Sequence, residues 1–280
     1  MDFLITYLEY FIVAFLAGII GALLGVGGGI IIVPALTIIF NLDIHLAIGA
    51  SIVAVVGTSV ASTGTYVKDN LVNMRLGIFL EVATSLGAVI GALLAPKLGK
   101  ELFILFAIVL IYAAYTMFTS SRIAEHLQIA KKNHKIAEYL HLEGKYINNS
   151  GEDPELKPYF VEKVPEIFGV SMGAGLASGL LGVGGGFIKV PALVKVSKIP
   201  MKNASATSNF MIGVTAATSA IIYLKNGFVD PLIAVPVAFG TLVGALLGSR
   251  IMRRVDATNL RAYFAFLLVI IAIQLFFKGI

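Results

Sequence analysis

The chain has 280 residues, of which 58% are apolar and 13% are charged, with a net charge of +5 and no cysteine. A soluble domain carries about 25% charged residues, and the apolar residues here form runs near the roughly 20 residues that a bilayer requires. These properties exclude an ordinary soluble domain, disulfides and thiolate metal sites, and they indicate an all-α, polytopic membrane protein. The cations lie between the apolar runs, where membrane topology explains them better than nucleic acid does.

The first half is predicted to hold five apolar helical elements, at residues 3–24, 30–40, 45–67, 76–94 and 102–118. The glycine run 25–29 separates the first two elements, and Pro96 follows the fourth, where a helix is expected to stop.

A polar segment at 120–163 joins the two halves and divides the chain into a first transmembrane repeat, 1–119, a linker, and a second repeat, 164–280. Its first part, 122–142, is predicted to be helical, and its second part, 144–160, carries two prolines and is predicted to be irregular. His126, His134 and His141 would share one face of that helix. We interpret them as part of a solvated face and predict no metal site.

The second half repeats the plan, with elements at 165–181, 187–196, 203–224, 231–248 and 260–277. A shift of 157 residues aligns 18–36 with 175–193, and 13 of these 19 positions are identical. The same shift aligns Ser51 with Ser208 and Thr58 with Thr215. Each half is therefore a copy of one unit.

The short second element decides between two topologies, because a helix of about 16 Å cannot cross the membrane alone. Either the first two elements form a hairpin, which leaves three crossings per half and inverted repeats, or they form one broken crossing, which leaves parallel repeats. The hairpin arrangement gathers most cations on one side and leaves the other side only Lys97, Lys100, Lys225 and Lys278, whereas the broken crossing divides them almost evenly. Because cations favour cytoplasmic loops, we predict two inverted-topology repeats in the cell membrane, each with a glycine-broken helical hairpin. The linker 120–163 is then cytoplasmic and both termini lie outside.

The glycine runs are the first candidate site. Non-helical backbone at membrane depth must be buried in protein or line a wet cavity, and glycine lets a ligand approach the backbone. A helix that begins at each run directs its free N–H groups and positive dipole end there, so two such ends would form an anion site. The alternative is a tight helix hairpin that needs small residues only for packing. The predicted substrate-binding glycines are Gly25, Gly27, Gly28, Gly29, Gly182, Gly184, Gly185 and Gly186.

Polar residues extend this site. Ser51 and Ser208, with Asn209 beside the latter, are predicted to contact substrate, although hydrogen bonding between helices explains such residues equally well. Lys189 follows the second glycine run, where it would attract an anion or snorkel from a short helix. Glu81 is interpreted as a solvated interfacial residue rather than a proton carrier. The G-x-x-x-G motifs of the fourth elements are predicted to be packing surfaces.

The duplicated motif G-x-x-x-x-L-L-G-V-G-G-G-x-I-x-V-P-A-L resembles that of the TauE/SafE sulfite exporter family, also called the toluene sulfonate uptake permease family. Ala206-Thr207-Ser208 resembles the Ala-Thr-Ser signature that follows the motif in that family. The resemblance covers nearly the whole chain outside 120–163. It implies transport of small sulfur-containing anions such as sulfite, sulfoacetate or other organosulfonates.

We therefore predict a secondary transporter, not an enzyme, that moves a small sulfur-containing anion by alternating access, without a cofactor and without a nucleic-acid partner. A coupling proton or cation and the oligomeric state are left open. The alternatives are a carrier for another small anion, such as a carboxylate, and a passive channel. No clustered catalytic acids or histidines favour a membrane-embedded enzyme.

Overall fold

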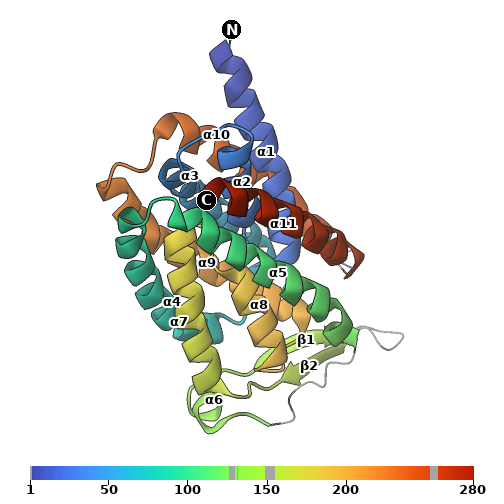
Figure 1. The fold of residues 1–280 in the computed structure, drawn as a ribbon. Helices are drawn as coiled ribbons and strands as arrows, with labels where there is room; N and C mark the ends of the chain where they lie inside the picture. The colour runs from blue at the N-terminus through green and yellow to red at the C-terminus, as the bar shows by residue number, and fades with distance from the viewer. Residues whose placement is uncertain (1, 126–129, 131, 149–154, 253–257) are drawn as a thin grey trace.

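The computed structural model describes residues 2–125, 130, 132–148, 155–252 and 258–280 (Figure 1). The first half contains α1 (Asp2–Leu24), α2 (Gly29–Ile38), α3 (Ile44–Lys68), α4 (Met74–Leu94), the 3₁₀ turn η1 (Ala95–Lys97) and α5 (Glu101–Glu125). The second half contains α7 (Val164–Leu181), α8 (Gly186–Lys195), α9 (Met201–Lys225), α10 (Pro231–Met252) and α11 (Thr258–Gly279). All ten predicted apolar elements are confirmed as helices.

Within the described residues, seven helices are long and apolar enough to cross a bilayer, namely α1, α3, α4, α5, α7, α9 and α10. The short helices α2 and α8 have 10 residues each, about half the length that a crossing requires. Large apolar side chains such as Ile108, Phe239 and Phe266 are exposed on the outside of the bundle, as expected of a surface that faces lipid. The multi-pass helical architecture is therefore confirmed.

Two helix pairs, α1 with α10 and α4 with α7, pack backbone to backbone through glycines. A Cβ atom added to Gly244 would meet the Phe15 carbonyl oxygen, and one added to Gly248 would approach Ile19. Residue numbers thus increase together along the two helices, which run in the same direction. Gly87 of α4 approaches α7 in the same way. The packing role of the G-x-x-x-G motifs is confirmed, and each pair joins one half of the chain to the other.

One end of the bundle carries the α2–α3, α4–α5 and α9–α10 loops. Nε2 of His45 lies 3.0 Å from the Leu98 carbonyl oxygen, and the His45 ring stacks on Phe228 with centroids 4.8 Å apart. Lys278, near the end of α11, donates to Asn41 Oδ1 at 3.1 Å. Figure 1 shows the start of α1 and the linker hairpin at opposite ends of the molecule.

The opposite end is covered by the linker, which two asparagines attach to both halves. Asn73, the N-cap of α4, donates through Nδ2 to the Leu142 carbonyl oxygen at 2.8 Å. Asn203 of α9 donates to the Leu71 and Lys145 carbonyl oxygens, at 3.1 and 3.0 Å. The linker is therefore packed onto the ends of the membrane helices.

The linker contains a β-hairpin, so the prediction of irregular backbone at 144–160 was wrong. Strand β1 (Gly144–Asn148) pairs antiparallel with β2 (Glu155–Tyr159). Gly144 leaves space for the ring of Tyr159, which is fully buried against the ends of α4 and α7. Burial raises the pKa of Tyr159 to about 12, so its phenol stays neutral and accepts a hydrogen bond from Asn73 Nδ2 at 3.1 Å. The hairpin is stabilised by this packing, which local composition does not reveal.

The single helix predicted at 122–142 was also wrong. Helix α5 ends at Glu125, and the next helix, α6, covers only Lys135–Tyr139. His126 lies outside the described residues. His134 is the N-cap of α6, whereas His141 follows the helix with a φ of 50°, so these two do not share a helix face. The described residues contain no group of three His, Cys, Asp or Glu that could hold a metal ion.

Candidate functional site

Both glycine runs form tight breaks between a long helix and a short one. Gly25 and Gly27 have φ angles of 72° and 73°, and their repeat partners Gly182 and Gly184 have 68° and 77°. Side chains other than that of glycine are strained in this conformation, which explains these four residues. The second loop differs from the first at Gly185, which has a φ of 73°. Its repeat partner Gly28 has a φ of −60°, in the right-handed helical region.

The two loops pack directly against each other, and the contact is reciprocal. A Cβ atom added to Gly29, the first residue of α2, would meet the Gly182 carbonyl oxygen and lie 2.9 Å from the Cα atom of Val183. A Cβ atom added to Gly186, the first residue of α8, would meet the Gly25 carbonyl oxygen in the same way. The N-termini of the two short helices therefore lie together. Such ends carry unpaired amides and a positive potential.

Ser51 and Ser208 each bind the glycine loop of the other half. The Ser51 hydroxyl donates to the Gly182 carbonyl oxygen at 2.8 Å, and the Ser208 hydroxyl donates to the Gly25 carbonyl oxygen at 3.4 Å. A hydroxyl has one hydrogen to donate, so in this conformation both serines stabilise the contact between loops. Their role as substrate ligands stays a prediction.

Asn209 is a buried polar residue on the face of α9 that meets the loops. It is fully buried, and neither Oδ1 nor Nδ2 has a hydrogen-bond partner among the described residues. Four residues earlier, Ser205 packs against Gly25. Three residues later, Ile212 packs against Gly184. This spacing places all three side chains on one helix face. Because an unpaired buried amide costs free energy, Asn209 is suited to bind a ligand that enters between the loops.

Ser205 belongs to the same polar surface, although it was not predicted from the sequence. Its hydroxyl is buried and has no hydrogen-bond partner in the described part of the chain. The repeat partners of Ser205 and Asn209 are Ile48 and Ile52. Comparing the two copies position by position would have found Ser205, because only the second copy carries polar side chains here.

Lys189 and Glu81 form a buried ion pair one turn beyond the second glycine loop. Lys189 is 1% exposed and Glu81 is 6% exposed, so both the snorkelling alternative for Lys189 and the interfacial placement of Glu81 were wrong. The Lys189 ammonium lies 3.8 Å from Glu81 Oε2 and donates to the Thr215 hydroxyl at 3.1 Å. Thr215 donates to Glu81 Oε1 at 2.7 Å, and Ser85 donates to the same oxygen at 3.1 Å. The cluster joins α4, α8 and α9.

The loop contact leaves little space. A cavity of about 20 Å³ lies beside Gly186, between Val26 and Phe187. That volume holds about one water molecule, which is much less than a sulfite or sulfonate group occupies. In this conformation the glycine loops are therefore closed on each other.

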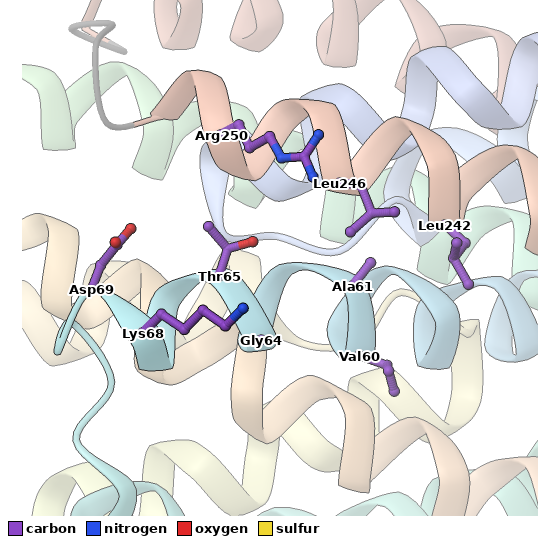
Figure 2. Close-up of a pocket in the computed structure, with 9 residues that line it drawn as sticks. All are labelled: Val60, Ala61, Gly64, Thr65, Lys68, Asp69, Leu242, Leu246 and Arg250. Carbon is purple, nitrogen blue, oxygen red and sulfur yellow. The ribbon is translucent and has the colours of Figure 1, made fainter.

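A larger, open cavity of about 570 Å³ lies between α3 and α10, and Figure 2 shows Lys68 and Arg250 on its facing helices. An added Cβ at Gly64 would meet nothing within 4 Å, whereas the repeat partner of Gly64 is Ile221. The absence of a side chain at this position helps to keep the cavity open. The lining residues are Val60, Ala61, Gly64, Thr65, Lys68, Asp69, Leu242, Leu246 and Arg250.

Comparison with known proteins identifies the family. A family model described as sulfite exporter TauE/SafE matches residues 10–275. The chain belongs to the TauE/SafE family. As a TauE/SafE protein it is a membrane transporter and not an enzyme.

The TauE/SafE chain is similar over its length to two curated transporters. The probable membrane transporter protein YunE of Bacillus subtilis is 27% identical over 278 residues, which cover 96% of this chain and 97% of that protein. The probable membrane transporter protein MJ0441 of Methanocaldococcus jannaschii is 27% identical over 281 residues, which cover 93% and 91%. No solved structure matches the chain.

Most of the residues predicted to bind substrate in this TauE/SafE chain lie together in the structure. The glycines of both loops, Ser51 and Ser208 meet where the loops make contact. Asn209 lies on the same face of α9 as Ser205 and Ile212, which pack against the loops. Lys189 lies a turn away, and its ammonium is directed to Glu81 and Thr215.

Proposed function

We propose that the protein is a secondary transporter of a small sulfur-containing anion, such as sulfite or an organosulfonate like sulfoacetate, and that this anion binds where the glycine loops meet. The observation that carries the proposal is the reciprocal contact of Gly29 and Gly186 with the opposite loop. It is supported by the Asn209 amide, which has no hydrogen-bond partner among the described residues and lies on the face of α9 that packs against the loops. Two helix N-termini supply N–H donors and positive potential. The Asn209 amide adds a donor without a charge.

We further infer that the two halves are inverted relative to each other. In the first half, Tyr10 of α1 contacts Phe40 just after α2, with ring centroids 4.7 Å apart. In the second half, the Glu162 amide, before α7, donates to the Ser197 carbonyl oxygen, after α8, at 3.4 Å. Each pair of helices thus returns toward the side where it started, and these sides are the two opposite ends of the bundle. By the distribution of cations, the end that carries the linker is cytoplasmic and both termini lie outside.

The closed contact between the loops supports transport by alternating access. A substrate reaches the site only when the two loops separate, and a symmetrical pair of halves allows separation toward either side. The cavity between α3 and α10 lies at the cationic end, and Lys68, Asp69 and Arg250 are among the residues that line it. Its inner wall includes Ala61, which clusters with Ala22, close to the first glycine loop. We infer that this cavity is the cytoplasmic approach to the site.

The first test is a thermal-shift screen of the purified protein in detergent with sulfite, sulfate, sulfoacetate, an aryl sulfonate, acetate, phosphate and chloride at matched ionic strength. A ligand that binds the folded state raises the melting temperature by mass action. We expect one sulfur anion to stabilise the wild-type protein. Asn209→Ile, which installs the residue of the first repeat, should abolish that shift.

Thr218→Ala is the matched control, because this hydroxyl lies on the same helix but bonds the Val214 carbonyl oxygen of its own helix. It should retain the full shift. Stabilisation by acetate alone would redirect the proposal to a carboxylate carrier. Saturable counterflow of the stabilising anion in proteoliposomes is the result expected of a carrier, whereas flux that does not saturate indicates a channel. No response to any anion would refute the binding site.

A further inference from the structure

Anion binding at the loops requires at most the positive charge of Lys189. The bundle also buries the negative charge of Glu81 beside it. Both residues lie inside the apolar bundle, where an ionisable side chain is expensive and usually functional. Replacing a buried ion pair by apolar residues is often neutral or stabilising. The equivalent positions are apolar, with Ile32 in the first half aligned to Lys189 and Ala238 in the second half aligned to Glu81, and the same helices form in both halves. The fold therefore does not need this pair.

The geometry around Glu81 leaves one carboxylate oxygen available. Oε1 accepts hydrogen bonds from Thr215 and Ser85, at 2.7 and 3.1 Å. Oε2 accepts no hydrogen bond from the described residues, and its only close charge is the Lys189 ammonium at 3.8 Å. A proton can therefore bind Oε2 without breaking the bonds to Oε1.

The groups that face Glu81 from neighbouring helices are few. Helix α8 contributes Lys189, α9 contributes the Thr215 hydroxyl, and α4 itself contributes Ser85. Helix α7, which packs along α4, has no titratable side chain after Glu166. Among the described residues, Lys189 is thus the one charged group that pairs with Glu81.

The pair is also close to the proposed anion site. The Lys189 amide donates to the Gly185 carbonyl oxygen at 3.1 Å, which places this lysine in the first turn of α8. On α9, Thr215 follows Ile212 by three residues, or about 4.5 Å of helix rise. Ile212 packs against Gly184 and Gly186. A movement that opens the loops therefore moves the ammonium and its partners.

We propose that Glu81 is the proton-binding residue that couples anion transport to proton transport, an inference that rests on the proposed function. In the closed conformation Lys189 is paired with the Glu81 carboxylate. When an anion enters, the ammonium turns to it, and the released carboxylate takes up one proton from water. The occupied site then holds a neutral acid, an ammonium and a monovalent anion, so its net charge stays zero. This balance makes the transport an electroneutral symport of one proton with one monovalent anion.

The test uses proteoliposomes and an aryl sulfonate, which is a monovalent anion at every pH of interest, or another monovalent sulfonate selected by the thermal-shift screen. With the outside acidic by one pH unit, one-to-one coupling raises the internal sulfonate about tenfold. Wild-type protein should reach this ratio, and clamping the membrane potential at different values should not change it. Glu81→Gln should lose the accumulation while keeping counterflow at equal pH within about twofold. The control Glu166→Gln, at an exposed position, should accumulate like the wild type.

The outcomes separate this inference from the proposed function. Counterflow without accumulation driven by pH in the wild type, or accumulation that persists in Glu81→Gln, would overturn the coupling role while leaving the transporter intact. No counterflow with any anion would refute the transporter itself. Because Glu81→Gln leaves a buried ammonium unpaired and can fail to fold, infrared difference spectra of the wild type provide a second measurement. Adding the transported anion should increase the carbonyl band of a protonated carboxylic acid, and an unchanged band would overturn the inference.

Discussion

The contact between the glycine loops can be tested by adding a single methyl group. Gly186→Ala places a Cβ atom 2.7 Å from Ile212 Cδ1 and 2.9 Å from Val26 Cα, and against the Gly25 carbonyl oxygen. The isoleucine can rotate, but the Gly25 carbonyl is backbone and is bound by Ser208. The loops must therefore move apart. Overpacking of this kind costs about 1–3 kcal/mol, which lowers the melting temperature by about 2–4 °C for each kcal/mol.

The assay is thermal unfolding in detergent, followed by circular dichroism. Gly173→Ala on α7 is the matched control, because an added Cβ there meets nothing within 4 Å. Alanine is favoured over glycine in a helix by about 0.5–1 kcal/mol, so the control should melt at the wild-type temperature or above it. If Gly186→Ala melted like Gly173→Ala, the two loops would not be packed against each other and the proposed site would lose its basis.

Two further predictions concern the cavity and the linker. Gly64→Ile introduces the residue that stands at the equivalent position of the second half, Ile221, and should partly fill the cavity of about 570 Å³. Anion counterflow should slow without a lower melting temperature, whereas the exposed control Ala217→Ile should transport normally. Normal counterflow by Gly64→Ile would contradict the proposed approach route. Tyr159 has a pKa raised from 10.0 to about 12, so above pH 10 the unfolded state loses a proton that the folded state keeps, and stability falls by up to about 3 kcal/mol as the pH approaches 12. Denaturant titrations at pH 9 and 11 should show this loss in the wild type and a smaller loss in Tyr159→Phe; equal losses would mean that this phenol does not titrate with unfolding.

The membrane helices could be predicted because their signals are local. Apolar runs of sufficient length, interrupted by glycines and polar turns, specify helices in a bilayer regardless of their neighbours. The linker could not be predicted in this way. Its hairpin depends on Tyr159 being buried against the ends of α4 and α7 and on the bonds from Asn73. Those partners lie in other parts of the chain, so composition alone suggested irregular backbone.

Part of the candidate site could be predicted because its signals, like those of the membrane helices, lie in the sequence itself. The glycines, Ser51, Ser208 and Asn209 repeat or flank a duplicated motif, which made them visible in the sequence. Ser205 was not predicted because it is polar in one copy only, whereas the predicted serines, Ser51 and Ser208, are present in both copies. Glu81 was misplaced because its position early in an apolar element resembles an interface, and only the packing of α4 against α8 and α9 buries it.

The sequence by itself determined that this is a duplicated helical membrane protein with a glycine break in each half, because apolar length and internal repetition are properties of the chain alone. Only the tertiary structure decided which groups meet. Residues more than a hundred positions apart, such as Ser51 and Gly182 or Glu81 and Lys189, are brought together by helix packing. The free energy of a hydrogen bond or an ion pair depends on distance and burial, and neither can be obtained from the order of residues along the chain.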